Sequence, residues 1–243
     1  MRTFRIALLR MVLGTFLFCA PTPSSANCLY PTSYFSPKSG TLPSKGAVVF
    51  FSRKPMPKPN FTLSPKGTMR VKTFRSGDLI AYQISYQTKA LKTFSITAKW
   101  KYKGRTAPVQ KASFRIKTQP TKHALQSISI GKVKRYVHKW ACSHSRVRYF
   151  SVAAPGAIAY QVEWSPSKSA YNKPSLRQTF LLPTNDDNYY SKNPKHVLNF
   201  GHVSCFGHTF RWKHKKIYFG LSALFADGSK TLLHTKPYTL LRP

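Results

Sequence analysis

Residues 79–86 read Leu79-Ile80-Ala81-Tyr82-Gln83-Ile84-Ser85-Tyr86, and every second position of this stretch is apolar or aromatic. Alternate side chains of a β-strand point to opposite faces, so a period of two predicts a half-buried strand. The same pattern, rich in β-branched and aromatic residues, recurs at 94–102, 113–117, 147–153, 157–164, 178–182 and 216–225. After residue 26 the chain has no sustained helical periodicity with capping residues. The sequence therefore predicts an all-β fold.

Turn-forming residues separate these stretches at short intervals: Ser39-Gly40, the prolines 55, 57 and 59, Pro65-Lys66-Gly67, Ser76-Gly77-Asp78, Lys103-Gly104, Pro155-Gly156, residues 185–188 and residues 226–229. Short strands punctuated this often predict β-sandwiches rather than α/β units. The polar segment 118–123 falls between two clusters of strands. We therefore predict two tandem β-sandwiches of the usual size, about 100 residues each, over 27–119 and 120–243. Residues 165–195 are polar and poor in strand patterns, and are expected to be a loop region of the second sandwich.

The first 26 residues have the pattern of a signal peptide. Arg2, Arg5 and Arg10 precede an apolar run over 11–18, and Ser24-Ser25-Ala26 supplies small residues for cleavage before Asn27. The run is shorter than the roughly 20 residues that span a bilayer, and no later segment is apolar enough to do so. Lipid attachment at Cys19 is a weaker alternative, because bulky Phe16-Leu17-Phe18 precedes it. We expect a secreted or periplasmic protein of the cell envelope, with no transmembrane segment.

Three cysteines remain after that cleavage: Cys28, Cys142 and Cys205. An exported protein of this kind is expected to hold one disulfide. We predict a bridge between Cys142 and Cys205, because both lie beside expected strands in the second half of the chain. Cys28, next to the new N-terminus, is the alternative partner in this disulfide, or it forms a disulfide with a second molecule.

The chain is strongly basic, with 40 Lys and Arg residues against 5 Asp and Glu and a formal net charge of +35. Charge this lopsided often marks a disordered tail. Here hydrophobic residues make up 42% and aromatic residues 14% of the chain, which is enough for a core. The cations must then mostly lie on a folded surface, where they attract polyanions.

Basic residues interleave with aromatic ones in several runs. We expect these cations to bind the polyanion: Lys99, Lys101, Lys103, Arg105, Lys132, Lys134, Arg135, Lys139, Arg146, Arg148, Arg211, Lys213, Lys215 and Lys216. Alternation at 99–103 predicts outward lysines and an inward Trp100 and Tyr102. Export favours an anionic envelope polymer or surface as the partner over nucleic acid. A compositional bias toward basic proteins, without any ligand, is the competing explanation.

Two segments suggest a family. The stretch from Cys28 through Pro31 to Phe35-Ser36-Pro37-Lys38-Ser39-Gly40-Thr41-Leu42-Pro43 resembles the opening of the first immunoglobulin-like domain in some secreted bacterial envelope proteins. Residues 203–207 together with 217–229 resemble the last two strands of a fibronectin-III-like domain. The resemblance implies export, a β-sandwich fold and a binding or structural role. It carries over no catalytic residue.

The chain has few carboxylates that could serve as catalytic acids or bases. Asp78 and Asp227 lie in turns, where such side chains usually bond to nearby backbone, and Glu163 is expected to pair with a Lys or Arg. An exported hydrolase of envelope polysaccharide, with Asp186, Asp187 or Glu163 as its acids, is the alternative function.

A metal-binding protein is a further alternative, because His196, His202, His208 and His214 recur every six residues. Cys205 is an odd number of positions from His202 and His208, so on one strand it would point away from both. We therefore predict no metal ion, no cofactor and no catalytic residue.

Overall fold

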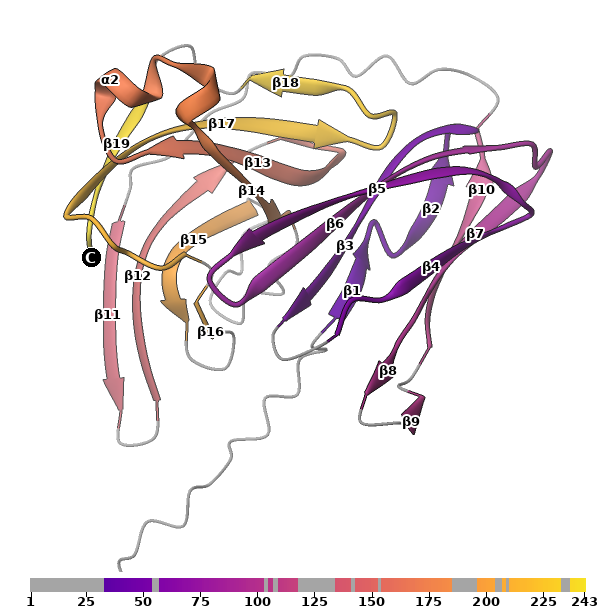
Figure 1. The fold of residues 1–243 in the computed structure, drawn as a ribbon, viewed down its shortest axis with the longest axis horizontal. Coiled ribbons are helices and arrows are strands. Elements are labelled where there is room, and N and C mark those ends of the chain that lie inside the picture. Colours follow the sequence, from indigo (N-terminus) through magenta and orange to yellow (C-terminus); the bar gives the residue numbers. More distant parts are fainter. Residues whose placement is uncertain are drawn as a thin grey trace, which may run out of the picture. The chain divides into compact units, whose positions relative to one another are not determined.

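The longest alternating stretches of the sequence form central strands of β-sheets in the computed structural model (Figure 1). The structure describes residues 33–53, 57–102, 105–106, 109–117, 134–140, 143–152, 154–184, 196–203, 207–208, 210–232 and 237–243. The predicted signal peptide, the three cysteines and the predicted boundary at 118–123 lie outside these residues and remain predictions.

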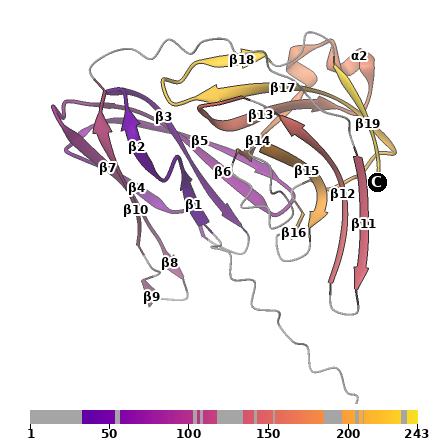
Figure 2. The same cartoon turned by 180° about the vertical axis from the view of Figure 1, so that it is seen from behind.

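The first half of the described chain forms these strands: β1 (Ser33–Ser36), β2 (Ser39–Leu42), β3 (Lys45–Arg53), β4 (Asn60–Ser64), β5 (Gly67–Ser76), β6 (Leu79–Thr88), β7 (Thr93–Lys99), β8 (Lys101–Tyr102), β9 (Arg105–Thr106) and β10 (Gln110–Ile116). They build one sheet in the order β1-β3-β6-β5, a second in the order β2-β10-β7-β4 and the small β8-β9 pair. The pairs are antiparallel except β2 with β10, which run parallel. Figure 2 shows β2, β10, β7 and β4 side by side from behind.

The two larger sheets of this half share one hydrophobic core. Phe50, Ile84 and Tyr86 from the first sheet lie in the same buried cluster as Phe94, Ile96 and Phe114 from the second. Burying a side chain of this size contributes about 2 kcal/mol, so these inward positions hold the sheets face to face. The arrangement is consistent with a β-sandwich.

The second half contains β11 (Lys134–Trp140), β12 (Ser143–Val152), β13 (Ala157–Ser165), β14 (Gln178–Pro183), β15 (His196–Val203), β16 (Gly207–His208), β17 (Lys216–Phe225), β18 (Lys230–Leu232) and β19 (Tyr238–Leu241). One sheet has the order β11-β12-β15-β16, and the other has β14-β13-β17-β18 with β19 also paired to β17. A short helix, α2 (Lys168–Tyr171), and a 3₁₀ turn, η1 (Pro174–Leu176), precede β14. Within the described residues no helix is long and apolar enough to cross a bilayer.

The central strands of the sheet β14-β13-β17-β18, β13 and β17, are largely buried on both faces. Phe180 and Phe219 on one face contact Phe200 of β15, with ring centroids 6.0 and 5.3 Å from that of Phe200. The same buried cluster includes Val49, Phe51 and further residues of β5 and β6 from the first half. Strand β13 is buried on both faces, since eight of its nine residues are buried and the exception is Glu163.

Hydrogen bonds join the two halves at the same junction. The Ala47 N–H donates to the Ala226 carbonyl at 2.8 Å, and the buried Ser36 hydroxyl donates to the Ile158 carbonyl at 2.7 Å. Gly46 is needed here, because a Cβ atom at this position would overlap the Ala226 carbonyl oxygen. Both halves belong to one compact unit, Pro31–Pro243.

Most of the predicted strands are confirmed, with a few corrections. Ser39-Gly40 was predicted as a turn but lies in β2, where Gly40 supplies a positive φ of 129°. Residues 165–195 were predicted to be a loop region apart from the strand at 178–182; that strand is confirmed as β14, but α2 and η1 also lie in this region. The predicted strand over 94–102 is interrupted at Trp100, because β7 ends at Lys99 and residues 101–102 pair with β9 instead. β17 is not among the last two strands, since β18 and β19 follow it.

Candidate polyanion-binding surface

The outer face of the sheet β2-β10-β7-β4 is lined only by hydroxyl-bearing, amide and cationic side chains. Parity separates this face from the core: Phe94, Ile96 and Phe114 point inward and are buried, and their neighbours along each strand point outward. We define the hydroxyl–cation face by its residues: Ser39 and Thr41 of β2, Asn60, Thr62 and Ser64 of β4, Thr93, Ser95, Thr97 and Lys99 of β7, and Lys111, Ser113 and Arg115 of β10.

Strand register arranges these side chains in rows across the sheet. One row joins Thr62, Thr97 and Lys111, and the next joins Ser64, Ser95, Ser113 and Ser39. A third row joins Thr93, Arg115 and Thr41. Neighbouring strands lie about 4.8 Å apart, so each row presents hydrogen-bonding groups at short, regular intervals.

The cations of this face are exposed and have no ion pair with any described residue. Lys99, Lys111 and Arg115 are all exposed, and none contacts a carboxylate of the described residues. Within the face, all of whose side chains are described, there is neither an acid nor an aromatic ring. Lys117, one step beyond β10, extends the line of outward cations, and its N–H donates to the Leu42 carbonyl at 2.8 Å.

Only some of the predicted polyanion-binding residues have described side chains. Lys99 is exposed and Trp100 is buried, which confirms the expected alternation at these two positions. Arg135, Lys213, Lys215 and Lys216 are also exposed, as is Arg211. The side chains of the remaining predicted cations, Lys101, Lys103, Arg105, Lys132, Lys134, Lys139, Arg146 and Arg148, lie outside the described ones.

Backbone register brings several predicted cations together even where their side chains are not described. Arg135 of β11 lies opposite Arg148 of β12, and Lys139 lies opposite His144. Arg146 lies opposite His202, which in turn pairs with His208 of β16. Lys111, Arg115 and Lys117 were not among the predicted cations, although Arg115 lies beside Phe114. Their alternation with Ala112, Phe114 and Ile116 is the pattern that identifies them.

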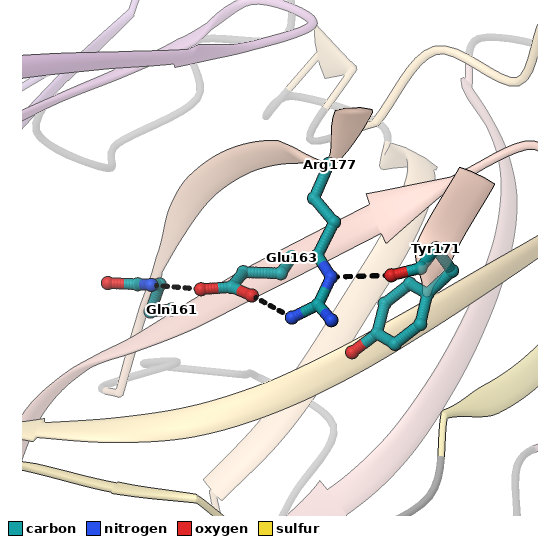
Figure 3. Close-up of polar contacts among 4 residues, drawn as sticks. All are labelled: Gln161, Glu163, Tyr171 and Arg177. Atoms are coloured by element: carbon teal, nitrogen blue, oxygen red, sulfur yellow. Dashed lines mark hydrogen bonds and ion pairs between the residues drawn. The ribbon is translucent and has the colours of Figure 1, made fainter. Parts of the chain in front are cut away.

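Each described acid has a hydrogen-bonding or ion-pairing partner. Figure 3 shows the Glu163 carboxylate between two donors: Gln161 Nε2 lies 2.9 Å from Oε1 and Arg177 Nη1 lies 2.9 Å from Oε2. The predicted Lys or Arg neighbour of Glu163 is thus confirmed as Arg177. Arg177 Nε also donates to the Tyr171 carbonyl at 2.6 Å, and its guanidinium lies 4.5 Å from the centre of the Tyr171 ring.

Local sequence explains how this cluster forms. Ser167 caps α2 by accepting a hydrogen bond from the Ala170 N–H at 3.2 Å, and Pro174 opens η1. These two turns bring Tyr171 and Arg177 over β13 and β17, where a side chain at Gly220 would overlap the Tyr171 hydroxyl. Burial raises the pKa of Tyr171, against the opposing effect of the Arg177 charge. The cluster therefore holds the α2–η1 segment on the sheet.

The other two described acids also have partners. Asp227 Oδ1 accepts a hydrogen bond from the Ser229 N–H at 2.8 Å, which confirms its expected turn role. Asp78 follows Gly77 in the β5–β6 turn, and its Oδ1 lies 2.8 Å from Arg211 Nη2. Asp186 and Asp187 lie outside the described residues, so the hydrolase alternative remains a hypothesis.

In the part of the chain that the structure describes, no three His, Cys, Asp or Glu side chains are grouped to hold a metal ion. No protein-family model matches the chain, and a search of curated proteins finds no match to it. The immunoglobulin-like and fibronectin-III-like resemblance is therefore supported only at the level of an all-β fold consistent with a sandwich.

Proposed function

We propose that this chain is an exported, non-enzymatic binding protein that adheres to anionic polymers of the cell envelope. In this proposal residues 27–119 and 120–243 are tandem immunoglobulin-like and fibronectin-III-like sandwiches. Support for the two domains comes from strand pairing: each of the four larger described sheets draws its strands from one half of the chain.

The hydroxyl–cation face is the observation that carries the proposal. An ordinary soluble surface interleaves both signs of charge, which limits self-repulsion. On this face Lys99, Lys111 and Arg115 stand among hydroxyl groups without a single carboxylate. A polyanion would relieve their mutual repulsion and release its own counterions, and neighbouring Ser and Thr side chains would hydrogen-bond to its oxygens. Exposed cations elsewhere, such as Lys213 and Lys215, would add dispersed contacts.

The composition of the face favours an envelope polymer over single-stranded nucleic acid. Proteins that bind single strands without sequence preference stack the bases on aromatic side chains within a basic groove. The aromatic residues of these strands, Phe61, Phe94 and Phe114, point into the core instead. The outward residues suit a ligand recognised through charge and hydroxyl groups.

The proposal is tested by retention of the purified protein on immobilised polygalacturonate and on neutral dextran, from about 50 mM to about 500 mM salt. We expect strong retention on the anionic polymer at low salt, a steep fall as salt rises, and little retention on dextran. Retention that ignores salt, or that is equal on the two polymers, would contradict the proposal.

A further inference from the structure

A groove lies where β2 meets the junction of the two halves, beside the hydroxyl–cation face. It has a volume of about 770 Å³, and its lining includes the whole of β2, Lys45, Lys117, Ile158, Thr184 and Ala226. Ligand pockets have volumes of about 300 to 1,000 Å³ and often lie between domains. Ser39 and Thr41 belong to both the groove and the hydroxyl–cation face, so the two surfaces are continuous.

The groove offers hydrogen-bond donors from an unpaired strand edge. β2 is the end strand of its sheet and pairs only with β10 among the described strands. The Leu42 carbonyl accepts from the Lys117 N–H, so Leu42 directs its backbone groups toward β10. Backbone groups alternate in direction along a strand, so Thr41 directs its N–H and C=O away from β10.

Charge and apolar surface complete the site. Lys45 and Lys117 are exposed residues of the lining, and neither contacts a carboxylate of the described residues. Leu42 and Ile158 are each 4% exposed and provide an apolar wall. Asp227, the acid of the lining, is already bonded to the Ser229 N–H. Cations, backbone donors and an apolar wall suit a ring that carries a carboxylate and several hydroxyl groups.

We infer that this groove binds an acidic sugar unit of the anionic polymer, which continues from the hydroxyl–cation face. The inference rests on the proposed function and adds the class of ligand and its place. An acidic peptide paired to β2 as an extra strand is less well suited, because Pro37 and Pro43 bound this four-residue edge.

The test measures binding of trigalacturonic acid, neutral galactotriose and a triglutamate peptide to the full protein by titration calorimetry. We expect the acidic trisaccharide to bind and the neutral one not to bind. The double variant Lys45→Gln with Lys117→Gln should weaken the acidic trisaccharide at least tenfold. The control variant Lys168→Gln with Lys173→Gln removes the same charge near α2 and should change binding less than twofold.

Two results would overturn the inference: an unchanged affinity in the groove variant, or triglutamate binding as tightly as the acidic trisaccharide. Its failure is distinguishable from failure of the proposed function. If long polygalacturonate is retained in a salt-dependent way but trigalacturonic acid does not bind, only the groove assignment is wrong. If long polygalacturonate is not retained at low salt, the proposed function itself is wrong. Thermal unfolding of each variant checks that these exposed lysines are not needed for folding.

Discussion

Two sheet faces of this protein carry polar residues for different reasons. On β13, the Glu163 carboxylate is bound by Gln161 and by Arg177, and Arg177 also contacts Tyr171 of α2 (Figure 3). On β7 and β10, Lys99, Lys111 and Arg115 lie on an outer face, exposed and without a carboxylate partner among the described residues. The ion pair of Glu163 with Arg177 helps to hold the fold together, whereas cations without a carboxylate partner among the described residues are available to a ligand. Substitutions on the two faces should therefore have opposite consequences.

The largest effect on stability is expected at Gly46, where the two halves of the described chain meet. Gly46→Val places a side chain against the Ala226 carbonyl, which already accepts the Ala47 N–H. The backbone must shift, and we expect the free energy of unfolding to fall by about 3 kcal/mol. Urea denaturation measures it. Thr97→Val on the hydroxyl–cation face is the control and should change stability by less than about 0.5 kcal/mol. Equal stabilities of the two variants would contradict the close packing at Gly46.

A second change removes the central residue of the Glu163 cluster. Arg177→Ala leaves the partly buried Glu163 carboxylate without its cation, and it also removes the contacts of Arg177 with Tyr171. The Arg177–Glu163 ion pair is partly buried, so its loss should cost more than that of a surface ion pair and less than that of a fully buried one. We expect a loss of about 2 kcal/mol in unfolding free energy. Retention on polygalacturonate should fall no more than for Lys168→Ala. A selective loss of retention with unchanged stability would assign the cluster to binding.

Removal of a single cation from the outer face should weaken binding and leave stability nearly unchanged. Lys111→Gln removes an exposed charge with no carboxylate partner among the described residues. Stability should change by less than about 0.5 kcal/mol. One cation near an anionic surface contributes about 1 kcal/mol, so the affinity for polygalacturonate at low salt should fall about fivefold. Calorimetric titration measures the affinity, with Lys230→Gln as the matched control. An equal loss in both variants would mean that attraction is spread over the whole surface.

A pH-dependent effect on stability is expected at a tyrosine that packs beneath the outer face. The Tyr86 hydroxyl donates to the Pro43 carbonyl at 3.0 Å, and its ring lies 4.8 Å from that of Phe94. Burial raises the pKa of Tyr86 above its ordinary value of 10.0. The folded state therefore holds this proton more tightly than the unfolded state. The resulting stabilisation is complete below pH 10 and is lost as pH rises from there toward the folded pKa.

Comparison of the protein with its Tyr86→Phe variant isolates this dependence. Near neutral pH the variant should lose about 1 kcal/mol with the hydrogen bond. Above pH 10 the difference in stability between the two proteins should shrink, because only the parent must deprotonate Tyr86 on unfolding. A difference that stays constant or grows between pH 9 and pH 11, measured by urea denaturation, would contradict burial of the hydroxyl.

Sequence patterns predicted several strands with one or both faces buried, such as β6, β13 and β17, but missed β3, of whose nine residues seven are buried. They missed β5, because seven of its ten residues are exposed and only Phe74 is buried. An edge strand with this composition has no apolar alternation to detect. They also missed the α2–η1 segment, whose four-residue helix depends on the Ser167 cap and on packing of Tyr171 over Gly220.

The candidate site was predictable only in part, for a physical reason. Alternation along one strand predicted an outward Lys99 beside an inward Trp100. The rows that place Thr97 beside Lys111, and Arg115 beside Thr41, depend on strand register, which is a tertiary property. The pairing of Glu163 with a cation was predicted from the excess of basic residues. Its identity as Arg177 depends on the turn through α2 and η1.

The most direct test of the central claim is the salt dependence of polygalacturonate binding in two charge-matched triple variants. One variant combines Lys99→Gln, Lys111→Gln and Arg115→Gln on the hydroxyl–cation face, and the other combines Lys168→Gln, Lys173→Gln and Lys230→Gln elsewhere. The slope of log affinity against log salt should become shallower by about 2 to 3 in the first variant, since each contact contributes 0.7 to 0.9. The second variant should keep the slope of the unmodified protein. Equal slopes for the two variants would contradict the assignment of polyanion binding to this face.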